Sequence, residues 1–330
     1  MPGSPDRHDQ PDDAAAAALR PLLFSIAYGM TGAVGDAEDI VQDALLGMTR
    51  ARQAGTAIAD PKAYLTTAVT RLGINYLNSA RVRRETYVGD WLPEPVVVPA
   101  DEPGPAGHAE LADSLSMAFL LLLETLSPVE RAVFMLREVF SYDYTAVARI
   151  TGKTEANCRQ IFTRARRRLA AGGQVQAGAG KQERSGGEEF ARRFFEAADG
   201  GDMDALLAML APDVVFHGDG GGKAQAIGKP LAGRERVARL LAGLFRRGRT
   251  LRASLRLAWV NGQPGAVTYD AQGRVVNVFE LEIADGVAQE IRSVVNPDKL
   301  RHLGPVSEVA LLQENGNYLS GRDHEQQCRG

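Results

Sequence analysis

The chain has only two cysteines, no long apolar run and a net charge of only −3. Cys158 and Cys328 lie 170 positions apart without CxxC or Cys/His ligand spacing, which argues against a disulfide framework and a zinc site. No apolar run reaches the roughly 18 residues that span a bilayer, and the N-terminus lacks the basic start and apolar core of a signal peptide. We therefore expect a cytoplasmic protein with no membrane segment, no metal and no cofactor.

What is present is a sequence long enough for more than one core. Its 330 residues correspond to about two domains, and 45% hydrophobic with 24% charged residues is typical of a globular protein. Acidic and basic residues are segregated along the chain. From Lys153 to Leu169, six basic residues stand against the single acid Glu155, which gives a surface suited to phosphates.

Two stretches have the composition of linkers. Residues 90–109 contain five prolines, which excludes a helix or a central strand, and residues 171–187 contain six glycines without apolar periodicity. We therefore divide the chain into blocks 1–89, 110–170 and 188–304, joined by linkers 90–109 and 171–187 and followed by a polar tail, 305–330.

The first block is predicted to be a small helical bundle. A helix near residues 19–30 precedes one from about Asp36, whose apolar stripe is Ile40, Val41, Ala44, Leu45 and Met48. Asp36, Asp39 and Asp43 share another face of that helix. Asp60 caps and Pro61 opens a third, long helix, whose apolar residues are Leu65, Val69, Leu72 and Tyr76.

The second block has the sequence form of a helix-turn-helix. A short apolar helix through Ile150 is followed by a turn at Thr151, Gly152 and Lys153, and Thr154 can cap the next helix. The buried positions of that second helix are Cys158, Phe162, Ala165 and Leu169. Its exposed N-terminal part is the portion that enters a major groove in DNA-binding proteins of this kind.

The third block has helices first and strands after them. Helices are expected at 188–198, 204–210 and 234–245, and strands at 214–217, 252–260, 266–269, 275–283 and 289–295. Turns such as Asn261-Gly262 separate the later strands. This order predicts an α+β domain with a curled antiparallel sheet.

These residues together resemble a bacterial sigma factor of the extracytoplasmic-function type. Residues 36–45 resemble the region-two helix that docks on core RNA polymerase, and residues 154–169 resemble the region-four recognition helix. Three further motifs match the subgroup with a fused C-terminal SnoaL-like domain. They are Trp91-Leu92-Pro93-Glu94-Pro95, the segment from Asp219 through three glycines to Lys223, and Asn296-Pro297-Asp298-Lys299-Leu300.

The resemblance implies a fold, partners and site residues. It implies two all-α sigma domains followed by a SnoaL-like, nuclear-transport-factor-like cone, in a non-catalytic initiation factor that binds the beta-prime clamp and beta flap of core polymerase. Polymerase contact is assigned to Asp36, Asp39, Gln42 and Asp43. Contact with the minus-10 element, opened to a single strand, is assigned to Thr56, Asp60, Arg71, Asn78, Arg81, Arg83 and Arg84. Contact with duplex minus-35 DNA is assigned to Thr154, Glu155, Asn157, Arg159, Gln160, Thr163, Arg164 and Arg167. Regulatory contact between domains is assigned to Trp91, Pro93, Glu94, Pro95, Asp219, Gly221, Lys223, Asn296, Pro297, Asp298 and Lys299.

Two other functions remain open at this point. His217 and Asp219 could form an acid/base pair in a SnoaL-type cyclase or isomerase fused to a DNA-binding segment. A plain helix-turn-helix repressor is also possible, but it offers no reason for the acidic face of Asp36, Asp39 and Asp43. The cone could in addition hold a small ligand that the sequence does not identify.

Overall fold

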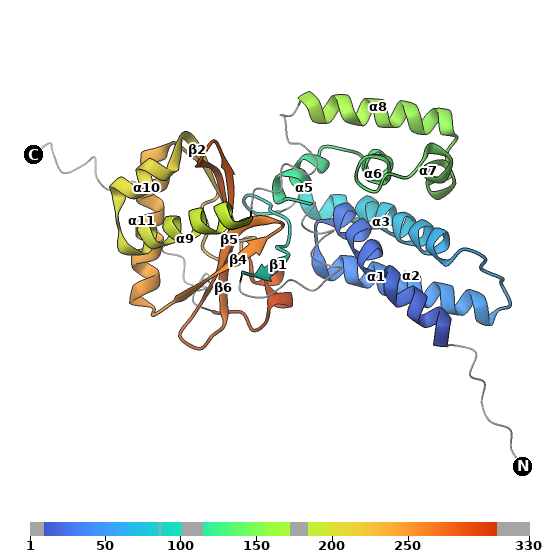
Figure 1. Cartoon of the computed structure of the whole chain (residues 1–330), viewed down its shortest axis with the longest axis horizontal. Helices are drawn as coiled ribbons and strands as arrows, with labels where there is room; N and C mark the ends of the chain where they lie inside the picture. Colours follow the sequence, from blue (N-terminus) through green and yellow to red (C-terminus); the bar gives the residue numbers. More distant parts are fainter. Residues whose placement is uncertain (1–9, 86, 101–114, 172–183, 309–330) are drawn as a thin grey trace, which may run out of the picture.

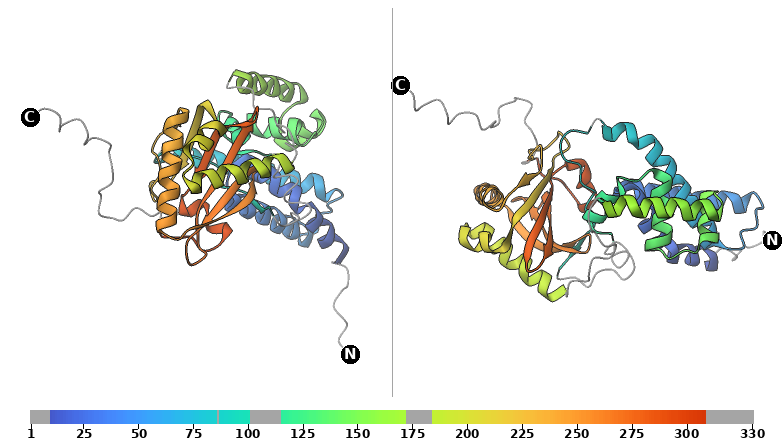
Figure 2. Two further views of the ribbon diagram at one scale, coloured as in Figure 1. Left: turned by 60° about the vertical axis from the view of Figure 1, so that its left-hand side comes forward. Right: turned by 90° about the horizontal axis from the view of Figure 1, so that it is seen from above.

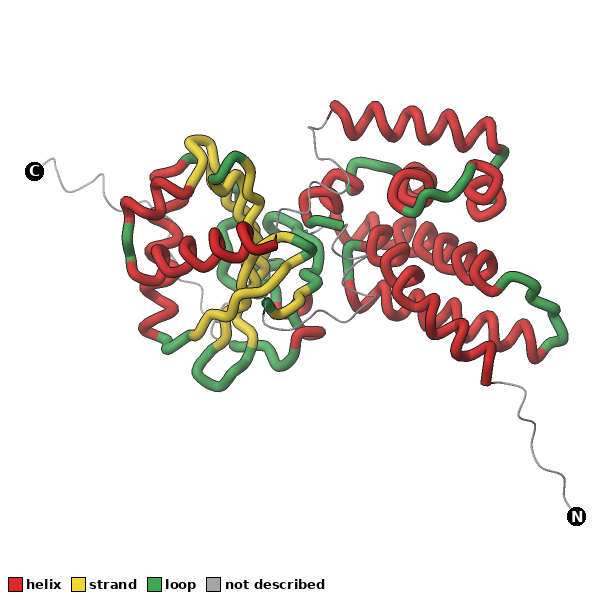
Figure 3. The backbone as a smooth tube through the Cα atoms, in the orientation of Figure 1, coloured by secondary structure: helices red, strands yellow, loops and turns green. Residues whose placement is uncertain are grey.

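The computed structural model describes residues 10–85, 87–100, 115–171 and 184–308. Helices fill one half of the molecule, and a sheet with covering helices forms the other (Figures 1 and 3). None of the helices in these ranges is both long enough and apolar enough to cross a membrane.

The first three helices form the predicted bundle. They are α1 (Gln10–Thr31), α2 (Val34–Gln53) and α3 (Pro61–Glu85). The predicted stripe of α2 is buried at Ile40, Val41, Ala44 and Met48, and Leu45 is half-buried. Asp60 caps α3 as expected, since its Oδ1 accepts a hydrogen bond from the N–H of Ala63 at 3.0 Å.

The helix-turn-helix is confirmed. After α5 (Met117–Leu123), α6 (Pro128–Phe134) and a π-helical turn, η1 (Met135–Val139), come α7 (Tyr144–Thr151) and α8 (Glu155–Ala171). Gly152 turns the chain with φ 67°, a backbone conformation that favours glycine. Thr154 Oγ1 then accepts the N–H of Asn157 at 3.2 Å. On α8 the fully buried residues include Ile161 beside Cys158, whereas Phe162, predicted as core, is half-buried and stacks on Phe134.

The two helical groups share one hydrophobic core. Leu23 of α1 and Val69 of α3 belong to the same cluster as Phe134 of α6 and Ala165 and Leu169 of α8. Arg71 adds a polar link, because its Nε donates to the carbonyl of Ile150 at 3.1 Å. In this structure the bundle and the helix-turn-helix are therefore packed together as one body.

The C-terminal half contains α9 (Arg184–Gly200), α10 (Met203–Met209) and α11 (Arg234–Thr250) beside the sheet. Helix α9 begins four residues before the predicted start, inside the glycine-rich stretch assigned to linker 171–187. The glycine at 187 suits this place because a Cβ there would lie 3.3 Å from the ring of Trp259. Helix α11 also runs five residues beyond its predicted end.

The sheet is mixed, so the expectation of an antiparallel sheet was wrong in one respect. The described strands follow the order β1-β4-β5-β6-β7-β2-β3, and β2 pairs with β7 in parallel. The chain between β2 and β7 includes α11, which is long enough for the crossover that parallel pairing requires. The strand bounds are β1 (Val97–Pro99), β2 (Leu210–Asp219), β3 (Leu231–Ala232), β4 (Ser254–Val260), β5 (Gln263–Tyr269), β6 (Val275–Ala284) and β7 (Val287–Val294).

The proline-rich segment supplies the edge strand of this sheet. Strand β1 pairs antiparallel with β4, and this edge position is one that proline tolerates. The sequence excluded a helix and a central strand here, and the described part of the segment agrees. Two short 3-10 turns, η2 (Pro297–Lys299) and η3 (Arg301–Leu303), follow the last strand and were not predicted.

The two faces of the sheet have different neighbours. Ala266, Phe279 and Ile291 pack with helices α9 to α11, whereas their chain neighbours Val267 and Val278 pack with Leu92 and Met117. Successive side chains of a strand point to opposite faces, which explains this division. Figure 2 shows the sheet lying between its covering helices and the helical half.

Candidate functional site

Helix α2 presents an acidic surface to solvent. Asp39, Gln42 and Asp43 are exposed, and neither aspartate has an ion-pair partner among the described residues. Asp36 differs, because it is half-buried and accepts a hydrogen bond from the hydroxyl of Tyr76 on α3. Of the four residues predicted to contact polymerase, three are therefore free to meet a basic partner, and Asp36 also fixes α2 to α3.

The residues predicted to contact the minus-10 element are spread over the loop before α3 and along that helix. Thr56 and Asn78 are exposed. Asp60 is exposed but serves as the cap of α3, and Arg71 donates to α7. The side chains of Arg81, Arg83 and Arg84 lie outside the described residues.

Helix α8 carries a row of exposed polar and basic side chains on the side away from the core. This row contains the predicted Asn157, Arg159, Gln160, Thr163, Arg164 and Arg167. Glu155 accepts a hydrogen bond from Thr145 at 2.7 Å and pairs with Arg159, whose guanidinium also lies 4.6 Å from the ring centre of Tyr144. Arg164 and Arg167 have no ion-pair partner within the described ranges. They are consequently the arginines of this face that are most available to phosphates or base edges.

Cys158 is fully buried on the opposite side of α8, with its sulfur 3.7 Å from the hydroxyl of Thr151. This agrees with its predicted place in the core, whereas Cys328 lies outside the described residues. No group of three or more His, Cys, Asp or Glu side chains in the described part of the chain could hold a metal ion.

A buried polar cluster joins the C-terminal half to the proline-rich segment. We call it the Asp219 cluster and define it by Tyr87, Leu92, Asp219, Asn296 and Lys299. The Asp219 carboxylate is fully buried and accepts hydrogen bonds from the N–H of Leu92 at 2.8 Å, from the ammonium of Lys299 at 2.6 Å and from the hydroxyl of Tyr87. Asn296 Nδ2 donates to the same hydroxyl at 2.8 Å. Because a buried charge is stable only when paired and hydrogen-bonded, these groups depend on one another.

Aromatic rings surround the cation of this cluster. The Lys299 ammonium lies 4.4 Å from the ring centre of Trp91 and 4.8 Å from that of Tyr87, and it also donates to the carbonyl of Leu92. Burial raises the pKa of the Tyr87 hydroxyl, and the nearby Asp219 charge adds to the rise, so Tyr87 remains a hydrogen-bond donor. Gly221 has φ 58°, and its backbone lies so close to the side chain of Asn296 that a Cβ at this position would overlap the Asn296 amide.

Glu94 connects the proline-rich segment to the start of helix α2. The residue before α2, Ala33, supplies no side-chain cap, and Glu94 Oε2 accepts the N–H groups of Val34 at 2.7 Å and Gly35 at 3.3 Å. The carboxylate thus satisfies donors that a helix N-terminus otherwise leaves open. Burial raises the pKa of this carboxyl, and the two N–H groups oppose that rise.

Other residues predicted to form the contact between domains lie outside the Asp219 cluster. The Pro95 carbonyl accepts from Nε2 of His302 at 2.8 Å, and Pro93 lies beside Gly32, while Pro297 opens η2 after the Asn296 cap. Lys223 and Asp298 form an ion pair with each other on the surface, outside the buried cluster.

Sequence reasoning missed several interface residues, among them Tyr28, Tyr87 and Asn261. The Tyr28 hydroxyl donates to the carbonyl of Glu94 at 2.6 Å and accepts from Asn261 Nδ2 at 2.7 Å. Asn261 also bonds the backbone of Val96. The sequence marked Asn261 only as part of a turn, and no spacing connects a residue at 28 with one at 261.

The two residues considered for acid/base catalysis contact the proline-rich segment and do not share a pocket. His217 Nδ1 lies 2.7 Å from an Asp90 carboxylate oxygen, and Asp219 is enclosed in its cluster. The large cavity of the C-terminal half is lined by Gly218, which lies between them, and by neither side chain. Both side chains are therefore engaged in contacts with the proline-rich segment.

Comparison with protein families assigns the chain in three successive parts. Residues 16–83 match sigma-70 region 2, residues 116–169 match sigma-70 region 4, and residues 191–295 match the SnoaL-like domain. The first two matches cover the helical half and the third covers the sheet-containing half. They agree with the order predicted from the motifs.

Two curated relatives and one solved structure extend this similarity over most of the chain. The ECF RNA polymerase sigma factor SigJ of Mycobacterium tuberculosis is 39% identical over 86% of this chain and 91% of its own length. A probable ECF RNA polymerase sigma factor of the same species, SigI, is 31% identical over 89% of this chain and 96% of its own. The crystal structure of SigJ superposes with a TM-score of 0.68 at 34% identity, covering 88% of this chain and 98% of that one.

Proposed function

The chain belongs to the extracytoplasmic-function RNA polymerase sigma factors, and from that premise we propose how its parts share the work of initiation. As a member of this family it is a non-catalytic transcription factor that binds core RNA polymerase and directs initiation at promoters. We place it in the cytoplasm, at the nucleoid when polymerase-bound, because transcription occurs there. We propose that its domains are 1–89, 110–170 and 188–304, with the last extended to residue 184 by the start of α9.

The polymerase contact is proposed to lie on the acidic surface of α2. The exposed Asp39, Gln42 and Asp43, continued by Asp36, would face the beta-prime clamp. Carboxylates without ion-pair partners among the described residues support this role, since complementary charge guides association and fixes its register. The helix-turn-helix would meet the beta flap.

The promoter contact is proposed to be divided between two elements. The exposed row of α8 would enter the major groove of the minus-35 element, with Arg164 and Arg167 as its leading cations and Thr154 fixing the start of the helix. The minus-10 strand would meet the loop at Thr56 and Asp60 and the α3 residues from Asn78 to Arg84. The observation that carries this proposal is the pair of exposed arginines, Arg164 and Arg167, which have no ion-pair partner among the described residues and lie on the second helix of a helix-turn-helix.

We also propose that the SnoaL-like domain regulates the sigma part in cis. The two DNA-contacting groups share one core. We infer that reading two promoter elements requires them to separate. The segment that connects them is bound to the C-terminal half by the Asp219 cluster and by the pairing of its strand β1 with β4. Because the SnoaL-like domain binds this proline-rich segment, it can control how readily the two DNA-contacting groups separate.

Two experiments test these proposals. Retention of the protein by core polymerase, followed by run-off transcription on promoter templates, tests the sigma function itself. Comparison of the full chain with chains 1–170 and 1–300 in the same assay tests the regulation. Equal output from all three chains would contradict a regulatory role for the C-terminal half.

A further inference from the structure

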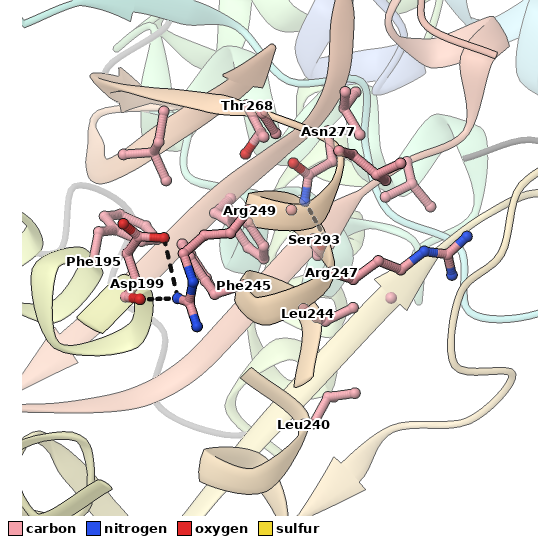
Figure 4. Close-up of a pocket in the computed structure, with 18 of the residues that line it drawn as sticks. Phe195, Asp199, Leu240, Leu244, Phe245, Arg247, Arg249, Thr268, Asn277 and Ser293 are labelled. Carbon is pink, nitrogen blue, oxygen red and sulfur yellow. Dashed lines mark hydrogen bonds and ion pairs between the residues drawn. The ribbon is translucent and has the colours of Figure 1, made fainter. Parts of the chain in front are cut away.

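A cavity of about 910 Å³ lies in the described C-terminal half, between the sheet and its covering helices (Figure 4). Phe195 of α9, Phe245 of α11 and Phe279 of β6 line it, with ring centres 5.8 to 6.1 Å apart. Its volume is within the range of pockets that bind small molecules, and such pockets are characteristically lined by apolar and aromatic side chains.

A short polar stripe crosses this apolar wall. Thr268 and Asn277 are directly opposite on β5 and β6, and Asn277 Nδ2 donates to Ser293 Oγ of β7 at 3.2 Å. Asn277 and Ser293 are only 8% and 4% exposed. Within the described chain Ser293 is the one side-chain partner of Asn277, which leaves an N–H and the amide oxygen of Asn277 for a ligand. A carbonyl or hydroxyl group would complete these hydrogen bonds.

One carboxylate of the cavity wall, Asp270, is unsuited to proton transfer. Asp270 also lines the cavity, but it accepts hydrogen bonds from Ser307 at 2.7 Å, from Arg274 Nε at 2.8 Å and from the N–H of Gln272 at 2.9 Å. The other charged lining residues lie on α9 and α11, where Arg249 pairs with Asp199. This arrangement favours binding over catalysis.

We propose that the cavity is a receptor site for an apolar, ring-containing small molecule with one carbonyl or hydroxyl group, and that its occupation acts on the Asp219 cluster. The second part of this inference rests on the proposed regulation in cis. The cavity and the cluster share backbone, because Gly218 and Val295 line the cavity while the next residues, Asp219 and Asn296, belong to the cluster.

Hydrogen bonds tie these two segments together. The N–H groups of Val295 and Asn296 both donate to the carbonyl of Asp219 at 2.9 Å. On β6, Asn277 faces the cavity while the adjacent Val278 packs with Leu92 on the other side of the sheet. A ligand that shifts this wall therefore moves residues that hold the proline-rich segment.

The probe for the binding test is 6-propionyl-2-(dimethylamino)naphthalene, a neutral two-ring ketone whose emission moves to shorter wavelength when it leaves water. We expect saturable binding to the full chain at one site. Leu244→Trp should reduce the affinity for the probe at least tenfold, because Leu244 lines the cavity and the larger ring would fill it. The Leu244 side chain is 40% exposed. Leu46→Trp, at a 43% exposed position on α2, is the matched control and should bind as the unaltered chain does.

Asn277→Leu tests the polar stripe separately from the volume. Loss of its hydrogen bond should weaken binding roughly threefold to tenfold, as expected for one neutral hydrogen bond. Absence of saturable binding, or affinity unchanged in both Leu244→Trp and Asn277→Leu, would overturn the receptor site. Leu244→Trp reduces the cavity volume, whereas Asn277→Leu removes a hydrogen bond. If one variant misfolds, the other therefore still tests the receptor site.

Run-off transcription tests the coupling. Saturating probe should change the output of the full chain at least twofold and leave Leu244→Trp unaffected. Probe binding without any change in output would overturn the coupling and leave the cis-regulation, which the truncated chains test, intact. Equal output from the truncated chains together with probe binding would instead overturn the regulation and retain the receptor site.

Discussion

The carboxylate of Asp219 accepts a hydrogen bond from the backbone N–H of Leu92 at 2.8 Å, across 127 positions of the sequence. This bond joins the C-terminal half to the segment that connects the two DNA-contacting groups. Since the donor is a main-chain group, substitution of Leu92 cannot remove it. The contact is therefore best tested through Asp219.

Replacement of Asp219 by alanine should destabilise the contact between the halves. Lys299 would keep a buried ammonium without its carboxylate, and breaking such a pair costs roughly 3–5 kcal/mol. Tryptophan fluorescence during urea unfolding can follow the change, because Trp91 packs on Lys299. We also expect altered run-off transcription by this variant.

Lys223→Ala is the matched control for the Asp219 substitution. Lys223 belongs to the same motif, but its ion pair with Asp298 is exposed, and exposed pairs contribute at most about 1 kcal/mol. Its unfolding midpoint and its transcription should therefore stay near those of the unaltered chain. Equal losses in both variants would contradict a special role for the buried pair.

Opposite charge reversals should separate promoter binding from polymerase binding. Arg164→Glu places a carboxylate on the exposed row of α8 and should abolish most promoter-specific initiation while core polymerase still retains the protein. Asp39→Arg should reduce retention by core polymerase most strongly, because it reverses the charge of the α2 surface. Pull-down and run-off transcription measure the two effects.

Arg236→Glu provides a charge-matched control for the reversal at Arg164. Arg236 is exposed on α11, in the C-terminal half, and within the described residues its one side-chain hydrogen bond goes to the carbonyl of Ala232. We expect normal retention and initiation from this variant. If Arg164→Glu behaved in the same way, α8 would not be the promoter-reading helix.

Loss of the Glu94 carboxylate should loosen the start of α2. Glu94→Ala removes the acceptor for the N–H groups of Val34 and Gly35, and loss of a helix cap costs about 1 kcal/mol. Hydrogen exchange measured by mass spectrometry should accelerate over the first turns of α2. Glu94→Gln keeps an acceptor oxygen and should exchange more slowly than the alanine variant; equal protection in both would argue against the cap.

Local patterns in the sequence were sufficient to predict most elements. The caps at Asp60 and Thr154 and the turn at Gly152 depend only on neighbouring residues, and all three were predicted correctly. The parallel pairing of β2 with β7 was not predicted, because it depends on where a distant chain segment returns. Propensity and periodicity carry no information on such pairing.

The same distinction applies to the candidate site. Motifs singled out Trp91, Glu94, Asp219 and Lys299, and the structure brings these residues to one interface. The aromatic partner Tyr87 escaped notice because a lone tyrosine has no spacing signal. The engagement of Arg71 with α7 also needed the structure, since an arginine on a predicted helix appears equally free for DNA.

The pH dependence of stability should reveal a carboxyl buried without full compensation. Burial raises the pKa of Glu280 to about 7 against the opposing charge of Arg292, and Glu282 and Glu290 add to the rise. Arg292 lies 2.8 Å from Glu282 and 3.5 Å from Glu280, and Glu280 Oε1 has no hydrogen-bond partner in the part of the chain that the structure describes. One guanidinium thus serves three carboxylates, and Glu280 is the most deeply buried of them.

The sign of the effect follows from proton uptake. Between the ordinary value of 4.5 and about 7, the folded protein binds more protons at Glu280 than the unfolded chain, so the free energy of unfolding falls as pH rises through this window. Glu280→Gln should flatten that fall and raise stability at pH 7.5 by about 3 kcal/mol. Glu282→Gln, at a 33% exposed position, is the control and should retain the fall. Urea unfolding at a series of pH values measures the free energy of unfolding of the unaltered chain and of both variants. If the free energy of unfolding of the unaltered chain rose between pH 5 and 7 relative to that of Glu280→Gln, Glu280 would be ionised in the folded protein.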